Sequence, residues 1–139
     1  MTAAPPECSE LLPFAPHYFG AQPKRQHFID EGTGAPVVML HGNPTWCYYY
    51  RNLIERLRPN FRCIAPDHLG CGLSDAPSAE EYAYRLADRV DDLEALLNDR
   101  LGDQPLTLVL HDWGGMIGMA WAHRHPQQVA RFVILNTAG

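Results

Sequence analysis

Asp112 lies where a side-chain carboxylate can act as a nucleophile, between an apolar run at 106–110 and a helical pattern at 115–123. A strand that passes to a helix within two or three residues bends sharply, and the residue at the bend is exposed and often strained. The positive end of the helix favours the ionised carboxylate. An ionised carboxylate with few competing partners is a usable nucleophile.

A simpler role is also open to Asp112, because Asp commonly caps the start of a helix. The neighbouring residues favour chemistry: Trp113 follows directly, and Gly114 and Gly115 permit close approach of helix and strand backbones. A second polar loop, His41 to Trp46, follows another apolar run at 37–40. Ligands of open α/β sheets bind beyond the carboxyl ends of the strands, so both loops are expected at one site.

The overall composition limits the classes of function. The chain has 139 residues, 46% of them hydrophobic, which suits one globular domain. Eleven Lys and Arg against sixteen Asp and Glu give a net charge of −5 and no basic stripe, so nucleic-acid binding is not expected. No apolar run approaches the roughly eighteen residues of a membrane span, and the N-terminus lacks the features of a signal peptide.

The cysteines indicate neither a disulfide framework nor a metal site. Four are present, without a Cys-x-x-Cys pair, and this usage predicts a reduced, cytoplasmic protein. Cys63, His68 and Cys71 are irregularly spaced and lack a fourth ligand, so zinc is not expected. We expect no metal and no cofactor.

The remaining pattern alternates strands with helices, which predicts an α/β fold with a doubly wound, mostly parallel sheet. Met116, Met119 and Trp121 are expected in its core. Residues 1–25 are rich in Pro and predict an extended arm, and 26–139 form the core domain. The expected strands are 26–30, 37–40, 61–65, 106–110 and 132–135, and the expected helices are 50–57, 86–97 and 115–123.

Four segments stand out: His41-Gly42-Asn43-Pro44-Thr45-Trp46, Arg62-Cys63-Ile64-Ala65-Pro66-Asp67, Gly70-Cys71-Gly72-Leu73-Ser74-Asp75 and Leu110-His111-Asp112-Trp113-Gly114-Gly115. Together they resemble the α/β-hydrolase superfamily, in its haloalkane dehalogenase-like branch. Within that branch the closest likeness is to the β-lactone decarboxylases of bacterial olefin biosynthesis, through the loop 66–75, the helix segment 89–93 and the stretch 112–118. The likeness covers only the N-terminal half of such an enzyme, without its cap domain.

The resemblance implies a role for each matching residue. Asp112 is the nucleophile that forms a covalent ester with a small apolar substrate, an alkyl halide or a long-chain cis-β-lactone. The side chains of Asn43 and Trp113 bind the leaving group, and their backbone N–H groups form the oxyanion hole. The general base of this fold follows the last strand, so His41 and His111 are expected to orient or pack, and His68 receives no role.

The resemblance also implies that the chain ends before the catalytic His and its partner acid. The 139 residues alone are therefore expected to show no catalytic turnover of a substrate. Three other functions stay open. An epoxide hydrolase more usually carries an aromatic residue in place of Asn43. The second is a non-catalytic hydrolase-like binding protein. The third is a module that binds an anion at the start of a helix, although an ionised Asp112 would repel the anion. The oligomeric state is not predicted.

Overall fold

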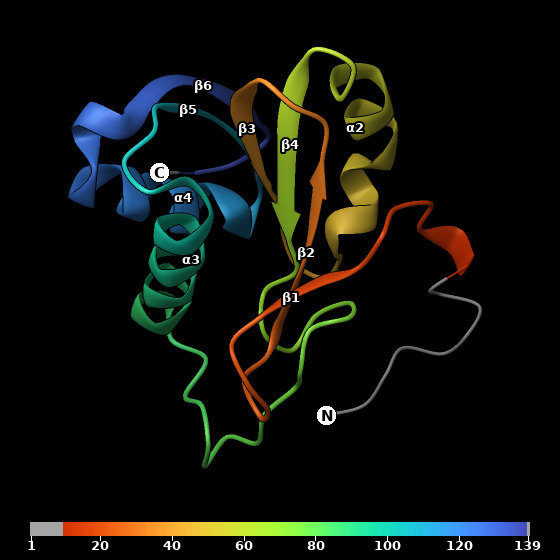
Figure 1. The fold of residues 1–139 in the computed structure, drawn as a ribbon. Coiled ribbons are helices and arrows are strands. Elements are labelled where there is room, and N and C mark those ends of the chain that lie inside the picture. Colours follow the sequence, from red (N-terminus) through yellow and green to blue (C-terminus); the bar gives the residue numbers. More distant parts are fainter. Residues whose placement is uncertain (1–9, 139) are drawn as a thin grey trace.

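The computed structural model describes residues 10–138 and contains one six-stranded sheet with helices on both faces (Figure 1). The strands lie in the order β1-β2-β4-β3-β5-β6. They are β1 (His17–Phe19), β2 (Gln26–Glu31), β3 (Ala35–Leu40), β4 (Phe61–Pro66), β5 (Leu106–His111) and β6 (Val129–Leu135). The helices are α2 (Arg51–Leu57), α3 (Leu86–Leu101) and α4 (Trp113–Arg124), and the short 3-10 helices are η1 (Cys47–Tyr50) and η2 (Pro126–Gln128).

The sheet is parallel at its centre and antiparallel at one end. β3 pairs in parallel with both β4 and β5, and β5 pairs in parallel with β6. β2 runs antiparallel to β4, and β1 antiparallel to β2. The predicted α/β fold with a doubly wound, mostly parallel sheet is therefore confirmed.

Both faces of the central strands are buried, which explains their apolar runs without alternation. On β3, Val38 and Leu40 pack in a cluster with α3 and α4. Val37 and Met39 point the other way, into a cluster with η1 and α2. Figure 1 shows the same division, with α2 on one face and α3 and α4 on the other.

The edge strand β6 departs from the expectation of a strand covered on both faces. Phe132, Val133, Ile134 and Leu135 are all between 38% and 52% exposed. β6 has β5 on one side, and within residues 10–138 no strand pairs with its other side. On α4, Trp121 is buried as expected, whereas Met116 is exposed because it lies on the outward side of the helix near Trp113.

The described part of the predicted N-terminal arm includes β1, which extends the sheet beside β2. Residues 1–9 of that arm, including Cys8, lie outside the described residues. Within 10–138, no helix is both long and apolar enough to cross a membrane.

Candidate active site

Asp112 lies at a sharp bend between β5 and α4, as the sequence predicts. β5 ends at His111 and α4 begins at Trp113, so Asp112 alone makes the turn. Its backbone has φ of 53° and ψ of −128°, a left-handed region that residues with a side chain rarely adopt. The side chain makes no capping hydrogen bond to the helix that follows, which argues against the cap role.

Close backbone packing holds the bend in place. Gly114 lies against the carbonyl of Leu40, and Gly42 lies against the side chain of Asp112, so a Cβ atom at either glycine would overlap those atoms. The residues after β6 brace the other side, where the hydroxyl of Thr137 donates to the carbonyl of Asp112. The bend therefore depends on strands that are distant in the sequence.

The structure brings Asn43 to the carboxylate of Asp112, although 69 positions separate them. The backbone N–H of Asn43 donates to Oδ2 of Asp112 over 3.0 Å. This hydrogen bond, and after it the influence of the neighbouring backbone N–H of Trp113, lowers the pKa of the Asp112 carboxyl below its ordinary value. The carboxylate is half-buried and no side chain of residues 10–138 pairs with it, so it is ionised at neutral pH and open to reaction.

The two predicted leaving-group ligands lie beside Asp112 and are exposed. Trp113 is 42% exposed, and Asn43 is also on the surface. Within the described part of the chain, neither the indole N–H nor the side-chain amide forms a hydrogen bond with another residue. An indole N–H and an amide NH₂ are both donors, so both remain available to an anion formed near the carboxylate.

The three histidines near the site are held by their surroundings. His41 and His68 are buried and hydrogen-bond to one another's backbone. The ring of His111 stacks on that of Tyr49, with ring centroids 4.5 Å apart. The expectation that His41 and His111 orient or pack is consistent with these contacts, and His68, which received no role from the sequence, is part of the same network.

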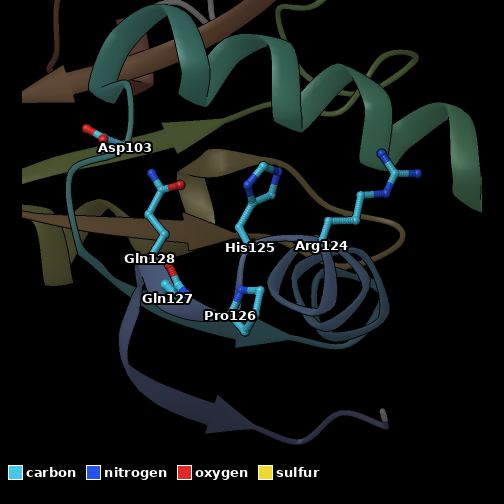
Figure 2. A pocket seen from close by; sticks show the side chains of 6 residues that line it. All are labelled: Asp103, Arg124, His125, Pro126, Gln127 and Gln128. Atoms are coloured by element: carbon cyan, nitrogen blue, oxygen red, sulfur yellow. The ribbon is translucent and has the colours of Figure 1, made fainter.

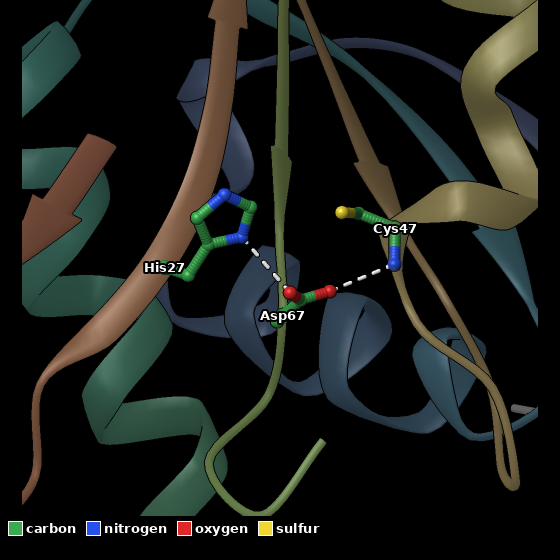
Figure 3. A group of neighbouring side chains, drawn as sticks. All are labelled: His27, Cys47 and Asp67. Atoms are coloured by element: carbon green, nitrogen blue, oxygen red, sulfur yellow. Dashed lines mark hydrogen bonds and ion pairs between the residues drawn. The ribbon is translucent and has the colours of Figure 1, made fainter. Parts of the chain in front are cut away.

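A second polar cluster, shown in Figure 3, joins His27, Cys47 and Asp67 in the core. Oδ2 of Asp67 accepts from Nδ1 of His27 and from the backbone N–H of Leu73, each over 2.9 Å. Oδ1 accepts from the backbone N–H of Cys47 over 2.8 Å. Burial opposes ionisation of Asp67, but these hydrogen bonds outweigh it and lower its pKa.

Both oxygens of Asp67 and Nδ1 of His27 are therefore already engaged in hydrogen bonds. A metal ion would have to displace the hydrogen bonds of Asp67, so the chemistry of the cluster favours a structural hub over a metal centre. The hub ties β2, η1 and the loop after β4 together. No local sequence pattern predicts this hub, because Asp67 and His27 lie 40 positions apart.

A hollow of about 510 Å³ lies at the other end of α4 from Asp112 (Figure 2). With a rise of about 1.5 Å per residue, the 12 residues of α4 separate the two by roughly 18 Å. Two of its charged or ionisable side chains are already paired: Arg124 contacts Asp91, and His125 contacts Glu94. This hollow contributes nothing to the site at Asp112.

Comparison with known proteins places these features in a family. Residues 35–138 match the family described as alpha/beta hydrolase fold. A cis-3-alkyl-4-alkyloxetan-2-one decarboxylase of Shewanella oneidensis is 54% identical over 127 residues, covering 91% of this chain and 40% of that protein. Haloalkane dehalogenase 2 of Mycobacterium tuberculosis is 41% identical over 128 residues, covering 92% and 44%.

Solved structures agree with this result. The haloalkane dehalogenase DpaA from Paraglaciecola agarilytica superposes with a TM-score of 0.86 and 30% identity, covering 99% of this chain and 49% of that one. The chain thus spans between two fifths and one half of the length of these proteins.

Proposed function

This chain belongs to the alpha/beta hydrolase fold family, and from that premise we propose that it carries the nucleophile of a haloalkane dehalogenase-like enzyme. Asp112 forms a covalent ester with a small apolar substrate. The supporting observation is the carboxylate at the bend, which is ionised and, among residues 10–138, contacted only by backbone donors. A carboxylate held in this way keeps a lone pair for an electrophile.

In the proposed step, an oxygen of Asp112 attacks a saturated carbon. A C–O bond forms, and the bond from that carbon to the leaving group breaks, with its electron pair going to the leaving group. The indole N–H of Trp113 and the side-chain amide of Asn43 stabilise the departing anion, because both groups are hydrogen-bond donors on residues next to the carboxylate and neither has another partner within residues 10–138. The backbone N–H groups of the same two residues hold the ester carbonyl oxygen.

For the substrate we favour a cis-dialkyl β-lactone, because the relative with 54% identity is a cis-3-alkyl-4-alkyloxetan-2-one decarboxylase. Asp112 attacks the saturated ring carbon that is bonded to the ring oxygen. The bond between that carbon and the ring oxygen breaks, the ring opens, and the ring oxygen becomes part of a free carboxylate. Loss of carbon dioxide then supplies the electron pair of a new C=C bond. The C–O bond to Asp112 breaks at the same time and returns its electrons to the aspartate.

With an alkyl halide, the ester must instead be hydrolysed by an activated water. The nearby rings of His41 and His68 are engaged in the core and cannot serve as the base. We expect the base and its acid in the part of the relatives that this chain does not span. A bromoalkane should therefore react once per molecule of the 139-residue chain, without turnover.

Mass spectrometry of the intact chain tests this proposal, with a 1-bromoalkane and a cis-3,4-dialkyl-oxetan-2-one as separate probes. The bromoalkane should add one alkyl group, located on the peptide that carries Asp112. The lactone should give either an adduct of its full mass on that peptide or the corresponding alkene. Asp112→Asn should abolish every product, whereas Asp103→Asn, which changes an exposed carboxylate, should not.

Other outcomes would replace the proposal. A folded chain that forms no product with either probe would support a non-catalytic binding protein. An adduct formed only with an alkyl epoxide would support an epoxide hydrolase. Repeated turnover of the bromoalkane by the 139 residues alone would contradict the expectation that the base lies elsewhere.

A further inference from the structure

One peptide unit, between Gly42 and Asn43, makes two hydrogen bonds in opposite directions. Its N–H donates to Oδ2 of Asp112 over 3.0 Å. Its carbonyl, the C=O of Gly42, lies 2.7 Å from Nδ1 of His41. The peptide group is planar, so whatever fixes the direction of this C=O also fixes the direction of the N–H.

The tautomer of His41 follows from its two partners. The backbone N–H of His68 donates to Nε2 of His41 over 3.1 Å, so Nε2 carries a lone pair. Nδ1 faces a carbonyl oxygen, which can only accept, so Nδ1 carries the proton. If the ring turned over, both hydrogen bonds would be lost.

His68 is locked to His41 in return. Nε2 of His68 lies 2.9 Å from the carbonyl of His41 and therefore carries a proton, and the two ring centroids are 4.1 Å apart. His41 is fully buried and His68 is 5% exposed. The pair thus forms a rigid link from the loop after β4 to the loop after β3.

Electrostatics keep this arrangement in its neutral form. Burial lowers the pKa of His41, and the nearby charge of Asp67 only partly offsets this effect. Burial, then the neighbouring His41, lowers the pKa of His68 well below its ordinary value. Arg89 is the other charged group near both rings and also lowers both values. Both rings therefore stay neutral at physiological pH.

We propose that His41 is a positioning residue, which aims the backbone N–H of Asn43 at the carboxylate of Asp112, and that the backbone N–H of His68 selects the tautomer that allows this. The proposal rests on the proposed function in so far as Asp112 is the reacting group. In that function the N–H of Asn43 must be fixed before the reaction, because a donor that needs no reorientation stabilises developing charge most effectively.

Two substitutions separate this role from simple packing. In His41→Asn, the side-chain NH₂ lies near the place of Nδ1 and can still donate to the carbonyl of Gly42. In His41→Gln, the amide lies near the place of Nε2 and cannot. His68→Leu is the matched control, because it removes a buried ring but retains the backbone N–H that faces His41.

NMR of the 139-residue chain measures the effect without any turnover. In the unmodified chain, the ¹⁵N shifts of His41 should show a protonated Nδ1 and an unprotonated Nε2. His41→Gln should move the backbone amide signal of Asn43. It should also raise the pKa of the Asp112 carboxyl, which is measured from the ¹³C shift of that carboxyl. His41→Asn and His68→Leu should leave both close to their original values. The ring signals of His111, the nearby charged group beside Asp112, are followed in the same samples.

A proton on Nε2 of His41 in the unmodified chain would overturn the proposal, even if every variant failed to fold. Equal changes in His41→Gln and His68→Leu would overturn it as well, because they would indicate a general loss of packing. Since neither measurement depends on a reaction, failure of this proposal is distinguishable from failure of the covalent chemistry at Asp112.

Discussion

Replacement of Asp67 by Asn should destabilise the fold strongly, although Asp67 is not expected to touch a substrate. The carboxylate accepts three hydrogen bonds in the core, from His27, Cys47 and Leu73. Asn keeps one acceptor oxygen and turns an NH₂ towards at least one donor. At least one hydrogen bond to a charged group is lost, which corresponds to about 1.5–3 kcal/mol.

Removal of the whole group would be more severe. Asp67→Ala leaves three buried donors unpaired, at about 1–3 kcal/mol each, so roughly 3–9 kcal/mol in total. Domains of this size are stable by only about 5–15 kcal/mol, so this variant is not expected to fold reliably. Asp67→Asn is therefore the variant to measure.

Urea denaturation provides the assay. With a slope of about 2 kcal/mol per molar urea, a loss of about 2 kcal/mol moves the midpoint down by about 1 M. Glu55→Gln is the control, because Glu55 is paired with Arg58 at the surface and surface pairs contribute little. If Asp67→Asn shifted the midpoint no more than Glu55→Gln does, the interpretation of Asp67 as a hub would be refuted.

The loss should also depend on pH. The pKa of Asp67 is lower in the folded chain than its ordinary value, despite burial, because of the hydrogen bond from His27 and the other donors. Its contribution to the free energy of unfolding is therefore present above the ordinary Asp pKa and is lost as the pH falls through the lowered value. The difference between wild type and Asp67→Asn should be full at neutral pH and should shrink in acid.

Three further predictions concern the site and the sheet edge. The ¹³C shift of the Asp112 carboxyl should titrate below the ordinary Asp value of 3.8, and a midpoint at or above 3.8 would contradict the stabilising effect of the backbone N–H groups of Asn43 and Trp113. Gly42→Ala should abolish the bromoalkane adduct, because the new methyl group overlaps Asp112, whereas Gly102→Ala, with open space around it, should retain the adduct. The exposed β6 should cause association of the chain at high concentration, and Ile134→Lys should reduce it in sedimentation experiments if apolar exposure is the cause.

The sequence is informative about the central strands and the bend. The continuous apolar runs of β3 and β5 predict strands buried on both faces, and the polar residue after each run predicts the edge at which Asn43 and Asp112 meet. This inference succeeds because parallel strands end at the same side of a sheet. It requires no knowledge of side-chain contacts.

The remaining features depend on contacts that no local pattern encodes. The hydrogen bond of His27 to Asp67 joins residues 40 positions apart, and the tautomer of His41 depends on the backbone of His68. The exposure of Ile134 was not predicted, because an apolar run has the same composition at an edge as in the centre of a sheet. Met116 was expected in the core and is exposed for a related reason, since helical spacing alone does not identify the outward side of α4.

The left-handed backbone at position 112 places two selective pressures in conflict. Glycine adopts a φ of 53° more easily than any other residue, so a chain selected for thermal resistance alone would drift towards glycine there. Such a chain would lose the carboxylate at the bend and, with it, the proposed reactivity. Directed evolution of this domain for heat tolerance should therefore be coupled to a screen that detects the covalent product.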